Sequence, residues 1–569
     1  MRVERGTSQI FFGLLPDQTA DLAGRVWRVD AWVDPVPLTL DQEAVRAAII
    51  RELIPWTRSH RDNGLADQLS ARTTVEVVQL NKDRGVRVES FPKQWRCKAC
   101  NRIEHSDDAA CKCGARAWAQ MQFVAYHDCG AAREPTISRC PEHHAVAVRL
   151  PGTARARELL FYCPECQVTV SQGFPFQSCT CGGGGMTITV HRAAVVFSPR
   201  FTVLVNPPDP VVAARLRANG GGARALEWIL DDMSRTDPTQ GRQTFAGLVE
   251  MLRRSGLSEE TAQDFARQAV ERGEVDASDS ETSVVLPDRV RDRAHEEALA
   301  LASAVAGGRM RVSDMIEGTT PPLRTLYESA YADALHNARL VTVDLLSSFP
   351  VVTLAFGYTR GDPSPGAARL VPFKEKGRIR AYGLRTQTEA LLFQLDPNAV
   401  YQYLVDLGHH LPPAKSSRDA RLSLMGSVDV PWPAQEKPQP LGRDLVTLLH
   451  SYAHRTIRRL ASFAGIERDA LAEYLLPHHL SFIVYAAVRG EFVLGGLQAV
   501  FETNLHRFLD DLVYGETRCP LDPGCYSGGG ACMACLHLGE PSCRWFNRFL
   551  DRSALFGSTG FLTIHRDRQ

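Results

Sequence analysis

The sequence lacks a long hydrophobic run. Its longest apolar stretch, from Leu480 to Val488, is far shorter than the roughly 20 residues that a membrane-spanning helix needs. The N-terminus carries only a short apolar patch, without the cleavage pattern of a signal peptide. We therefore expect a cytoplasmic protein that does not enter a membrane.

The sequence also lacks the short motifs of common enzyme classes. It has no G-x-x-x-x-G-K-[ST] phosphate loop, no G-x-G-x-x-G loop after a strand and no G-x-S-x-G nucleophile turn. The H-x-E and P-C-x-x-C signature of zinc deaminases is absent too. These absences favour a protein that is not an enzyme, and they argue against ATPase, methyltransferase and nuclease activity.

Neither positive nor negative charge is in excess. Lys and Arg number 65, Asp and Glu also number 65, and lysine is scarce among the basic residues. Any contact with nucleic acid must therefore come from a local basic face. At 569 residues the chain is too long for one core, and about 150 residues per domain gives roughly three to four domains.

Cysteine, in contrast, is plentiful and clustered. The chain has 15 cysteines, and pairs spaced C-x2-C or C-x-C in a protein that is not secreted are typical of metal ligands. Two stretches share one format, C-x2-C-x10-C-x-C and C-x2-C-x12-C-x-C, which predicts a zinc ribbon used twice. The predicted ligands are Cys97, Cys100, Cys111 and Cys113 in the first ribbon, and Cys163, Cys166, Cys179 and Cys181 in the second.

Histidines and two further cysteines lie between the two predicted ribbons. His127, Cys129, Cys140 and His143 form H-x-C-x10-C-x2-H, which could hold a third zinc ion. The alternative is two free cysteines with solvent-facing histidines, and the spacing does not decide between the two.

A last cysteine cluster lies near the C-terminus. Five cysteines occur within 25 residues, interrupted by glycines and prolines, and they predict a further tetrahedral site. We expect Cys525, Cys532, Cys535 and Cys543 to be its ligands, with Cys519 as the cysteine left over. Three to four Zn²⁺ per chain are expected. All would be structural, because four protein ligands leave no open coordination position at any predicted site.

The hydrophobic patterns predict an α+β, multidomain fold. We expect an N-terminal α+β segment (1–92), a zinc-ribbon block (93–205), a central helical domain (206–340) and a C-terminal mixed α/β domain with the cysteine-cluster zinc site (341–569). Within them, Asp41 is expected to cap a helix over Asp41–Leu53, and a long helix is expected over Leu441–Ala464.

One hairpin could contact DNA. Basic residues alternate along it, and alternation along a strand places several of them on one face, where they could follow a phosphate backbone. A solvated strand edge is the alternative reading. The residues are Lys374, Lys376, Arg378, Arg380 and Arg385.

Several blocks resemble one protein family. They are Leu448–Leu475, Ile483–Leu497 and the segment PSCRWFNRFLDRSALFG, extended upstream by Ala355–Arg360, Glu389–Asp396 and Pro92–Gly130. These blocks resemble DrmB, a subunit of the bacterial DISARM antiphage system. More distantly, they resemble the cysteine-bearing C-terminal domain of MrfA-type DNA-repair helicases. The opening segment and the Cys129-Gly130-Ala131 stretch depart from the usual DrmB pattern.

The resemblance implies a non-ATPase accessory subunit. In DISARM such a protein pairs with DrmA, a superfamily-two helicase, and the pair engages DNA. It also implies structural or partner-contacting roles for His454, Arg360, Asn547, Asp551 and Arg552. A helix would place Asn547 and Asp551 on one face, so they could equally form a buried hydrogen-bond network that holds the zinc module. Two other functions stay open: a metal-dependent nucleic-acid hydrolase, and a scaffold that binds only protein.

Overall fold

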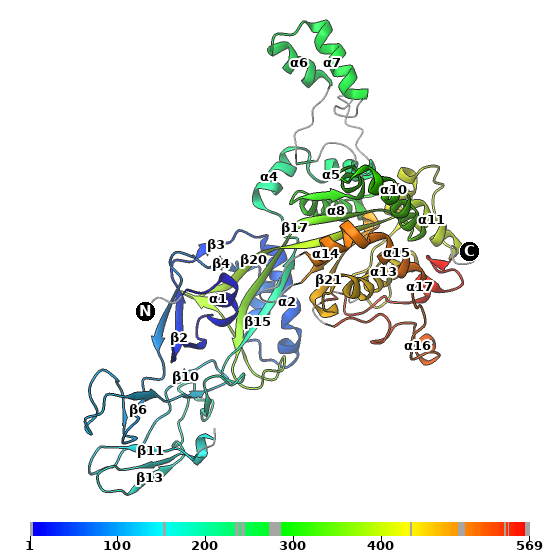
Figure 1. Ribbon diagram of the computed structural model, residues 1–569. Helices are drawn as coiled ribbons and strands as arrows, with labels where there is room; N and C mark the ends of the chain where they lie inside the picture. The colour runs from blue at the N-terminus through cyan, green and yellow to red at the C-terminus, as the bar shows by residue number, and fades with distance from the viewer. Residues whose placement is uncertain are drawn as a thin grey trace. The chain divides into compact units, whose positions relative to one another are not determined.

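The computed structural model describes residues 4–151, 155–233, 238–239, 245–271, 286–432, 435–487, 495–539, 542–543 and 545–563. The chain forms two compact units, one of residues 1–204 and 352–385 and one of residues 205–351 and 386–569. Both combine helices and strands, so the mixed α/β, multidomain organisation predicted from the sequence is confirmed (Figure 1). The division into four segments stays a prediction.

Two long strands belong to both units. Strand β17 covers Leu340–Thr359 and strand β20 covers Arg378–Leu395. Most side chains of both strands are buried, because apolar residues follow one another instead of alternating with polar ones. The two strands therefore contribute residues to the core of each unit.

Among its described residues, the first unit contains three α-helices and many short strands. Its helices are α1 (Thr7–Gly13), α2 (Gln42–Arg58) and α3 (Leu65–Ser70). Its further strands are β1 (Thr19–Leu22), β2 (Arg25–Trp32), β3 (Val36–Pro37), β4 (Glu76–Gln79), β5 (Val86–Ser90), β6 (Trp95–Cys97), β7 (Ile103–Glu104), β8 (Trp118–Gln120), β9 (Phe123–Tyr126), β10 (Ala132–Arg133), β11 (Ala147–Arg149), β12 (Leu160–Tyr162), β13 (Thr169–Gln172), β14 (Thr187–Val190), β15 (Ser198–Val205), β18 (Leu370–Pro372) and β19 (Lys374–Glu375).

Helix α2 covers one part of this unit's sheet. As predicted, Asp41 caps the helix, and its carboxylate accepts a hydrogen bond from the backbone N–H of Ala44 at 2.7 Å. Val45, Ile49 and Leu53 lie on one face and are buried against strand residues of the same unit. This face anchors the N-terminal segment to the sheet.

The cysteine-rich block of this unit consists of three small sheets. Each has three strands, in the orders β7-β6-β8, β10-β9-β14 and β11-β12-β13. Their apolar clusters are small, so hydrophobic burial alone supplies little stability. Metal ions are the usual source of stability for such small layers.

The second unit is richer in helices. Its helices are α4 (Pro210–Ala218), α5 (Gly221–Leu230), α6 (Phe245–Arg254), α7 (Glu259–Glu271), α8 (Asp288–Val305), α9 (Val312–Glu317), α10 (Pro321–Asn337), α11 (Pro397–Asp406), α12 (Ser417–Ser427), α13 (Pro440–Ala464), α14 (Gly496–Ala499), α15 (Leu505–Tyr514), α16 (Gly524–Ser527) and α17 (Ser553–Phe556). Its further strands are β16 (Arg309–Arg311), β21 (Leu471–Leu476) and β22 (Ser481–Ala486).

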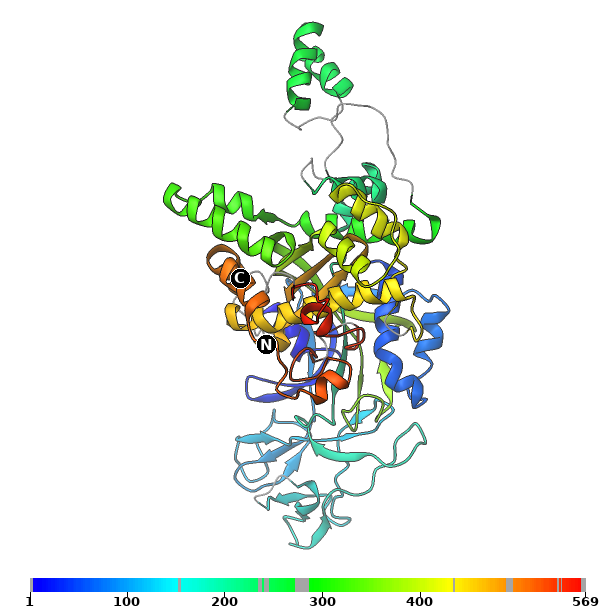
Figure 2. The same ribbon diagram turned by 90° about the vertical axis from the view of Figure 1, so that its right-hand side faces the viewer.

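Helix α13 lies at the centre of this unit's core. It packs against β21, β22, α15 and α17, and Figure 2 shows the red α17 beside it. The predicted helix over Leu441–Ala464 is confirmed, with one residue more at its start. Its buried face also carries four polar residues, His450, Ser451, His454 and Thr456, each fully buried. Buried polar groups require hydrogen-bonding or ligand partners, so this face of α13 is a candidate for a buried binding site.

No helix among the described residues is both long and apolar enough to cross a membrane. Residues 488–494, part of the Ile483–Leu497 block singled out in the sequence, lie outside the described residues.

Candidate metal centres

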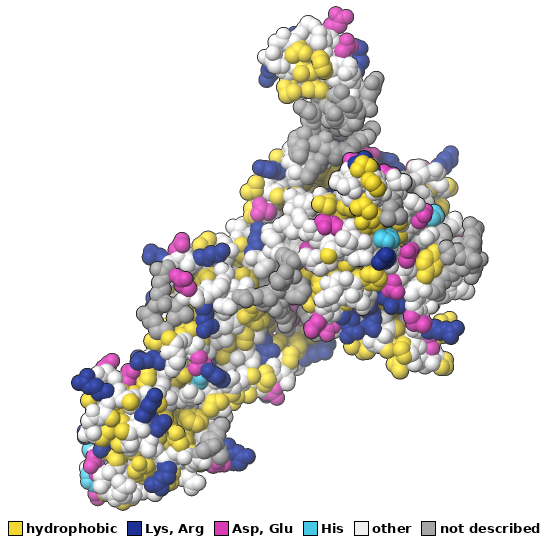
Figure 3. Space-filling view, in the orientation of Figure 1, with side chains coloured by type: hydrophobic (Ala, Val, Ile, Leu, Met, Phe, Trp, Pro, Cys, Tyr) yellow, Lys and Arg dark blue, Asp and Glu magenta, His cyan; other side chains and the backbone are white. Residues whose placement is uncertain are grey.

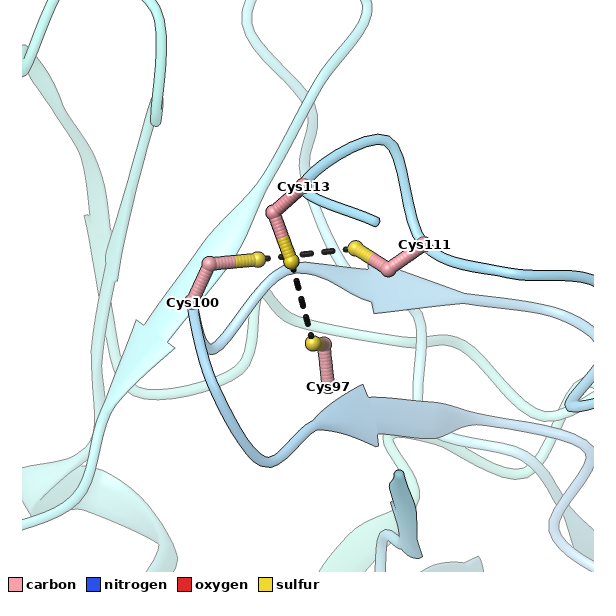
Figure 4. Close-up of side chains that lie close together, drawn as sticks. All are labelled: Cys97, Cys100, Cys111 and Cys113. Atoms are coloured by element: carbon pink, nitrogen blue, oxygen red, sulfur yellow. Dashed lines mark hydrogen bonds between the residues drawn. The ribbon is translucent and has the colours of Figure 1, made fainter. Parts of the chain in front are cut away.

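The first cysteine group lies on the β6–β7 turn and the loop before β8. The Sγ atoms of Cys97 and Cys113 are 3.6 Å apart, and those of Cys100 and Cys111 are 3.5 Å apart. Figure 4 shows all four sulfur atoms pointing toward a common centre. Sulfur atoms around one tetrahedral ion at a Zn–S distance of about 2.3 Å would be roughly 3.8 Å apart. The four residues are those grouped by the sequence pattern.

One thiol of this group, that of Cys97, has a lowered pKa. Burial raises the pKa of Cys97, but hydrogen bonds from the backbone N–H groups of Cys100 and Ala99 outweigh it and lower the pKa to about 7. Because the thiolate is the metal-binding form, these amides favour metal capture.

The second predicted ribbon does not form as one site. Cys163 and Cys166 lie with Cys140 and His143, whereas Cys179 and Cys181 lie with His127 and Cys129. The grouping of Cys163, Cys166, Cys179 and Cys181 around one ion is therefore wrong. The histidine-containing set His127, Cys129, Cys140 and His143 does not form one site either.

Distances within the two mixed groups fit one ion each. In the first group, the Cys129 and Cys179 sulfurs are 3.5 Å apart, and Nδ1 of His127 is 3.4 Å from Sγ of Cys181. In the second, Nδ1 of His143 is 3.6 Å from Sγ of Cys140 and 3.7 Å from Sγ of Cys163. Each group offers three sulfurs and one imidazole nitrogen, a common donor set for zinc.

Strand pairing explains this arrangement. Strands β11 and β12 pair antiparallel, with Ala147 opposite Tyr162, so the residues before β11 meet those after β12. Likewise Tyr126 of β9 pairs with Thr187 of β14, so the residues after β9 meet those before β14. The Cys140 and Cys163 group is therefore nested inside the His127 and Cys179 group along the chain.

The C-terminal group differs from the predicted set by one residue. Cys519 and Cys532 are 3.5 Å apart, and Cys525 and Cys535 are 3.6 Å apart, measured between sulfurs. Cys519, expected to be left over, belongs to the group. Cys543 does not: its Sγ lies 3.3 Å from Nε2 of His450, in a different cluster.

Arginines from α13 and from the start of α17 hold this C-terminal loop. Arg458 donates to the carbonyl oxygens of Ala534 at 2.6 Å and His537 at 3.2 Å. Arg552 donates to the carbonyl of Thr517 at 2.9 Å and pairs with Asp522 at 2.7 Å, and the hydrogen bond to Asp522 raises its pKa. A Zn²⁺ ion held by four thiolates carries two negative charges, which these guanidinium groups would offset.

A cavity of about 280 Å³ opens beside this loop. Five of its lining residues are arginines, and Glu516 is its acidic residue. Figure 3 shows dark blue Lys and Arg side chains gathered near α16. Sequence reasoning missed this cavity because its arginines come from three separate segments, namely α13, the loop and the start of α17. They are Arg455, Arg458, Arg459, Arg518 and Arg552.

The predicted basic hairpin forms between β19 and β20. Lys374, Lys376 and Arg378 are exposed around a turn in which Lys376 and Gly377 both have positive φ. Arg380 instead pairs with Glu76 at 2.9 Å and is half-buried, as is Arg385. The turn residues therefore present their charge to solvent, whereas Arg380 is held by carboxylates within the unit.

The polar residues suggested by the family resemblance have structural contacts. Arg360 is fully buried and donates to the carbonyls of Gly130, Asp17 and Val196. Asn547 binds the backbone N–H and carbonyl of Leu538, both at 2.9 Å. The helix considered for Asn547 and Asp551 is not present, because α17 begins only at Ser553. Their role as a hydrogen-bond network holding the metal loop agrees with these contacts.

Two comparisons with known proteins bear on these centres. Residues 6–191 match the family described as Domain of unknown function (DUF8724), a range that includes the N-terminal segment, the first cysteine group and both nested sites. The chain is also 32% identical over 127 residues to the DISARM protein DrmB of Bacillus paralicheniformis. That match covers 20% of this chain and 23% of the relative, so the chain aligns with less than a quarter of the relative's length.

Proposed function

We propose that this chain is an accessory subunit of a DISARM-like bacterial antiphage complex in the cytoplasm. In this proposal it pairs with a DrmA-like superfamily-two helicase, and the pair engages DNA while the helicase supplies the motor. The similarity to the DISARM protein DrmB supports the defence role. We also propose that the C-terminal region is related to the cysteine-bearing domain of MrfA-type helicases.

We propose Zn²⁺ as the ion in the four cysteine-rich groups. Their donors are four sulfurs or three sulfurs and one imidazole, at spacings that suit tetrahedral coordination. Four protein ligands leave no position for water or substrate, so these ions would have structural roles. This argues against the alternative of a metal-dependent hydrolase built on these centres.

The arginine-lined cavity beside the C-terminal cysteines is the observation that carries the DNA proposal. Arginine is the residue that binds phosphate through two parallel hydrogen bonds. Arg518 is exposed at this cavity, whereas Arg455 and Arg458 are held by backbone carbonyls that fix their positions. A cavity with positioned cations suits a phosphate of the DNA backbone.

The β19–β20 turn is a second basic surface for the same role. Lys374, Lys376 and Arg378 are all exposed there. Flexible exposed side chains suit loose contact with phosphates, which adds affinity without sequence preference.

DNA affinity should be measured for the chain co-purified with its helicase, by fluorescence anisotropy over a range of salt concentrations. Arg518→Ala and Lys376→Ala should each weaken binding and lower the slope of log affinity against log salt by about 1 for each lost phosphate contact. Lys82→Ala, an exposed lysine on another loop, is the matched control and should change neither value.

Failure to co-purify with a helicase encoded nearby, together with no salt-dependent DNA binding, would contradict the proposal. Pairing with the helicase but no DNA affinity would favour a scaffold that binds only protein. Divalent-metal-dependent cutting of DNA by the chain alone would favour the hydrolase.

A further inference from the structure

A fifth group of metal-binding side chains lies inside the second unit. His450 and His454 are four residues apart on α13, so both face the same side of the helix. Glu473 of β21 and Cys543, which lies between α16 and α17, complete the group, and all four donor atoms lie within 4.8 Å of one another. Each of the four residues is at least 95% buried.

We propose that His450, His454, Glu473 and Cys543 bind a structural metal ion, of which Zn²⁺ is the best match. Nε2 of His450 lies 3.3 Å from Sγ of Cys543 and 3.0 Å from Glu473, and Nε2 of His454 lies 3.4 Å from Glu473. Ligands on one tetrahedral zinc ion, with bonds of about 2.0–2.3 Å, are roughly 3.3–3.5 Å apart.

The hydrogen bonds behind the histidines fix which nitrogen faces the centre. Nδ1 of His450 is 2.7 Å from the carbonyl oxygen of Arg548, and Nδ1 of His454 is 2.9 Å from that of Leu536. A carbonyl oxygen only accepts, so both Nδ1 atoms carry the proton. Nε2 is therefore the nitrogen that each ring presents to the group, as in metal-bound histidines.

Several buried atoms of this group lack a hydrogen-bond partner. They are Nε2 of His454 and both carboxylate oxygens of Glu473. Leaving buried polar atoms unpaired is costly, and a cation at the centre would satisfy all three at once. These atoms face the centre of the group, where one ion could contact all of them.

The surroundings of Cys543 suit a thiolate. The backbone N–H groups of Trp545 and Asn547 both point to its Sγ, each at 3.3 Å. Similar amide contacts reach Cys181 from Gly183 and Cys519 from Leu521, at 3.3 and 3.4 Å. Cys543 thus has the local geometry of cysteines in the other candidate centres.

The charges of the donors also fit burial. One thiolate and one carboxylate balance a divalent cation, so the loaded site would be neutral, which a sealed interior requires. Two imidazoles, a thiolate and a carboxylate suit zinc, and four protein ligands without solvent access indicate a structural role. The ion would join α13, β21 and the C-terminal loop.

Elemental analysis combined with zinc K-edge X-ray absorption of the wild-type chain tests this proposal. All 15 cysteines belong to the five groups, so five ions would share 15 sulfur ligands, or about 3.0 sulfurs per zinc. Five zinc ions per chain with this average would support the site. Four ions with about 3.5 sulfurs each, the value when Cys543 is left out, would overturn it.

Variants provide the second measurement. Cys543→Ser and Glu473→Gln should each lower the content by one zinc ion per chain. Ser451→Ala, a buried non-ligand on the same helix, should retain all five ions. Unchanged zinc content in both ligand variants would also overturn the proposal. If either variant fails to fold, the zinc content and average sulfur coordination of the wild-type chain still test whether the fifth site binds an ion.

Discussion

The replacement of a cysteine by a histidine changes the charge of a metal site. With a divalent ion, four thiolates give a net charge of −2, and three thiolates with one neutral imidazole give −1. Each candidate centre that would carry net charge has at least one partly exposed ligand. Cys113, Cys181 and His143 are exposed in their groups, whereas the neutral group of His450 is sealed. Charged sites remain near water because burying net charge is expensive.

The nested arrangement of the two mixed sites can be tested with one pair of substitutions. The double variant Cys166→Ser, Cys181→Ser removes one ligand from each nested site, so it should lose two zinc ions per chain. If Cys163, Cys166, Cys179 and Cys181 held a single ion, the same variant would lose only one. Elemental analysis against the two single variants, each expected to lose one ion, gives the answer.

The ligands of these sites were easier to predict than their grouping. The C-x2-C and C-x-C spacings identify Cys163 and Cys181 because a ligand pair on one turn is a local feature. Which two pairs share an ion depends on strand pairing between distant segments, such as Ala147 opposite Tyr162. The spacing of ligands in the sequence does not show which strands pair. His450 and His454 had a local signal, H-x3-H on a helix, but Glu473 is close to them only after folding.

At the scale of elements, the turn between β21 and β22 contains a second kind of buried histidine. His479 lies in the 3-10 turn Pro477–His479, and its Nε2 donates to the carbonyl of Ala294 at 2.8 Å. Burial lowers its pKa from the ordinary value near 6.5 to about 4, a shift that the nearby Glu297 opposes. His478 and Arg421 lie close by and disfavour a further positive charge.

This histidine should make the second unit less stable in acid. Because the folded pKa is lowered, protonation favours the unfolded chain, so stability is complete above about pH 6.5 and falls as the pH drops toward 4. Between pH 7.0 and 5.5 the loss should be roughly 1 kcal/mol. His479→Gln cannot titrate, so this variant should lose correspondingly less stability over the range.

Urea unfolding at the two pH values measures the effect, with zinc content checked at both. His105→Gln, at an exposed histidine, is the control and should retain the pH dependence of the wild type. An equal loss of stability in His479→Gln and wild type would show that other groups cause the acid sensitivity.

The elements themselves were largely readable from the sequence. The long helix over Pro440–Ala464 and the cap at Asp41 follow from periodicity and capping residues. The helix considered for Asn547 and Asp551 was not found, since Phe546, Asn547 and Phe549 all have positive φ. Hydrogen bonds to Leu538 and the adjacent metal loop hold this segment in turns, and local propensity does not include them.

For the whole molecule, metal removal should affect separate regions to different degrees. The cysteine-rich sheets of the first unit have small apolar cores, whereas the second unit is built on a large apolar cluster around α13. Chelation should therefore open the block between β6 and β14 and the loop of Cys519–Cys535 before the core of the second unit melts.

Limited proteolysis with and without a chelator, followed by mass spectrometry, measures this difference. New cleavage sites should fall within residues 95–190 and 519–539, while α13 and β22 stay protected. Restored protection after zinc is added back would show that the opening is due to the metal. Simultaneous cleavage throughout both units would contradict a local role for the ions.

Nested metal sites also have a consequence for synthesis on the ribosome. His143 and Cys163 are 20 residues apart in the chain, and Cys129 and Cys179 are 50 apart. The inner set is complete once Cys166 emerges, before the last two ligands of the outer set have been translated. An ion captured there shortens the stretch that the outer ion must close, and a shorter stretch costs less entropy to close. The order of translation and the order of metal capture would then coincide.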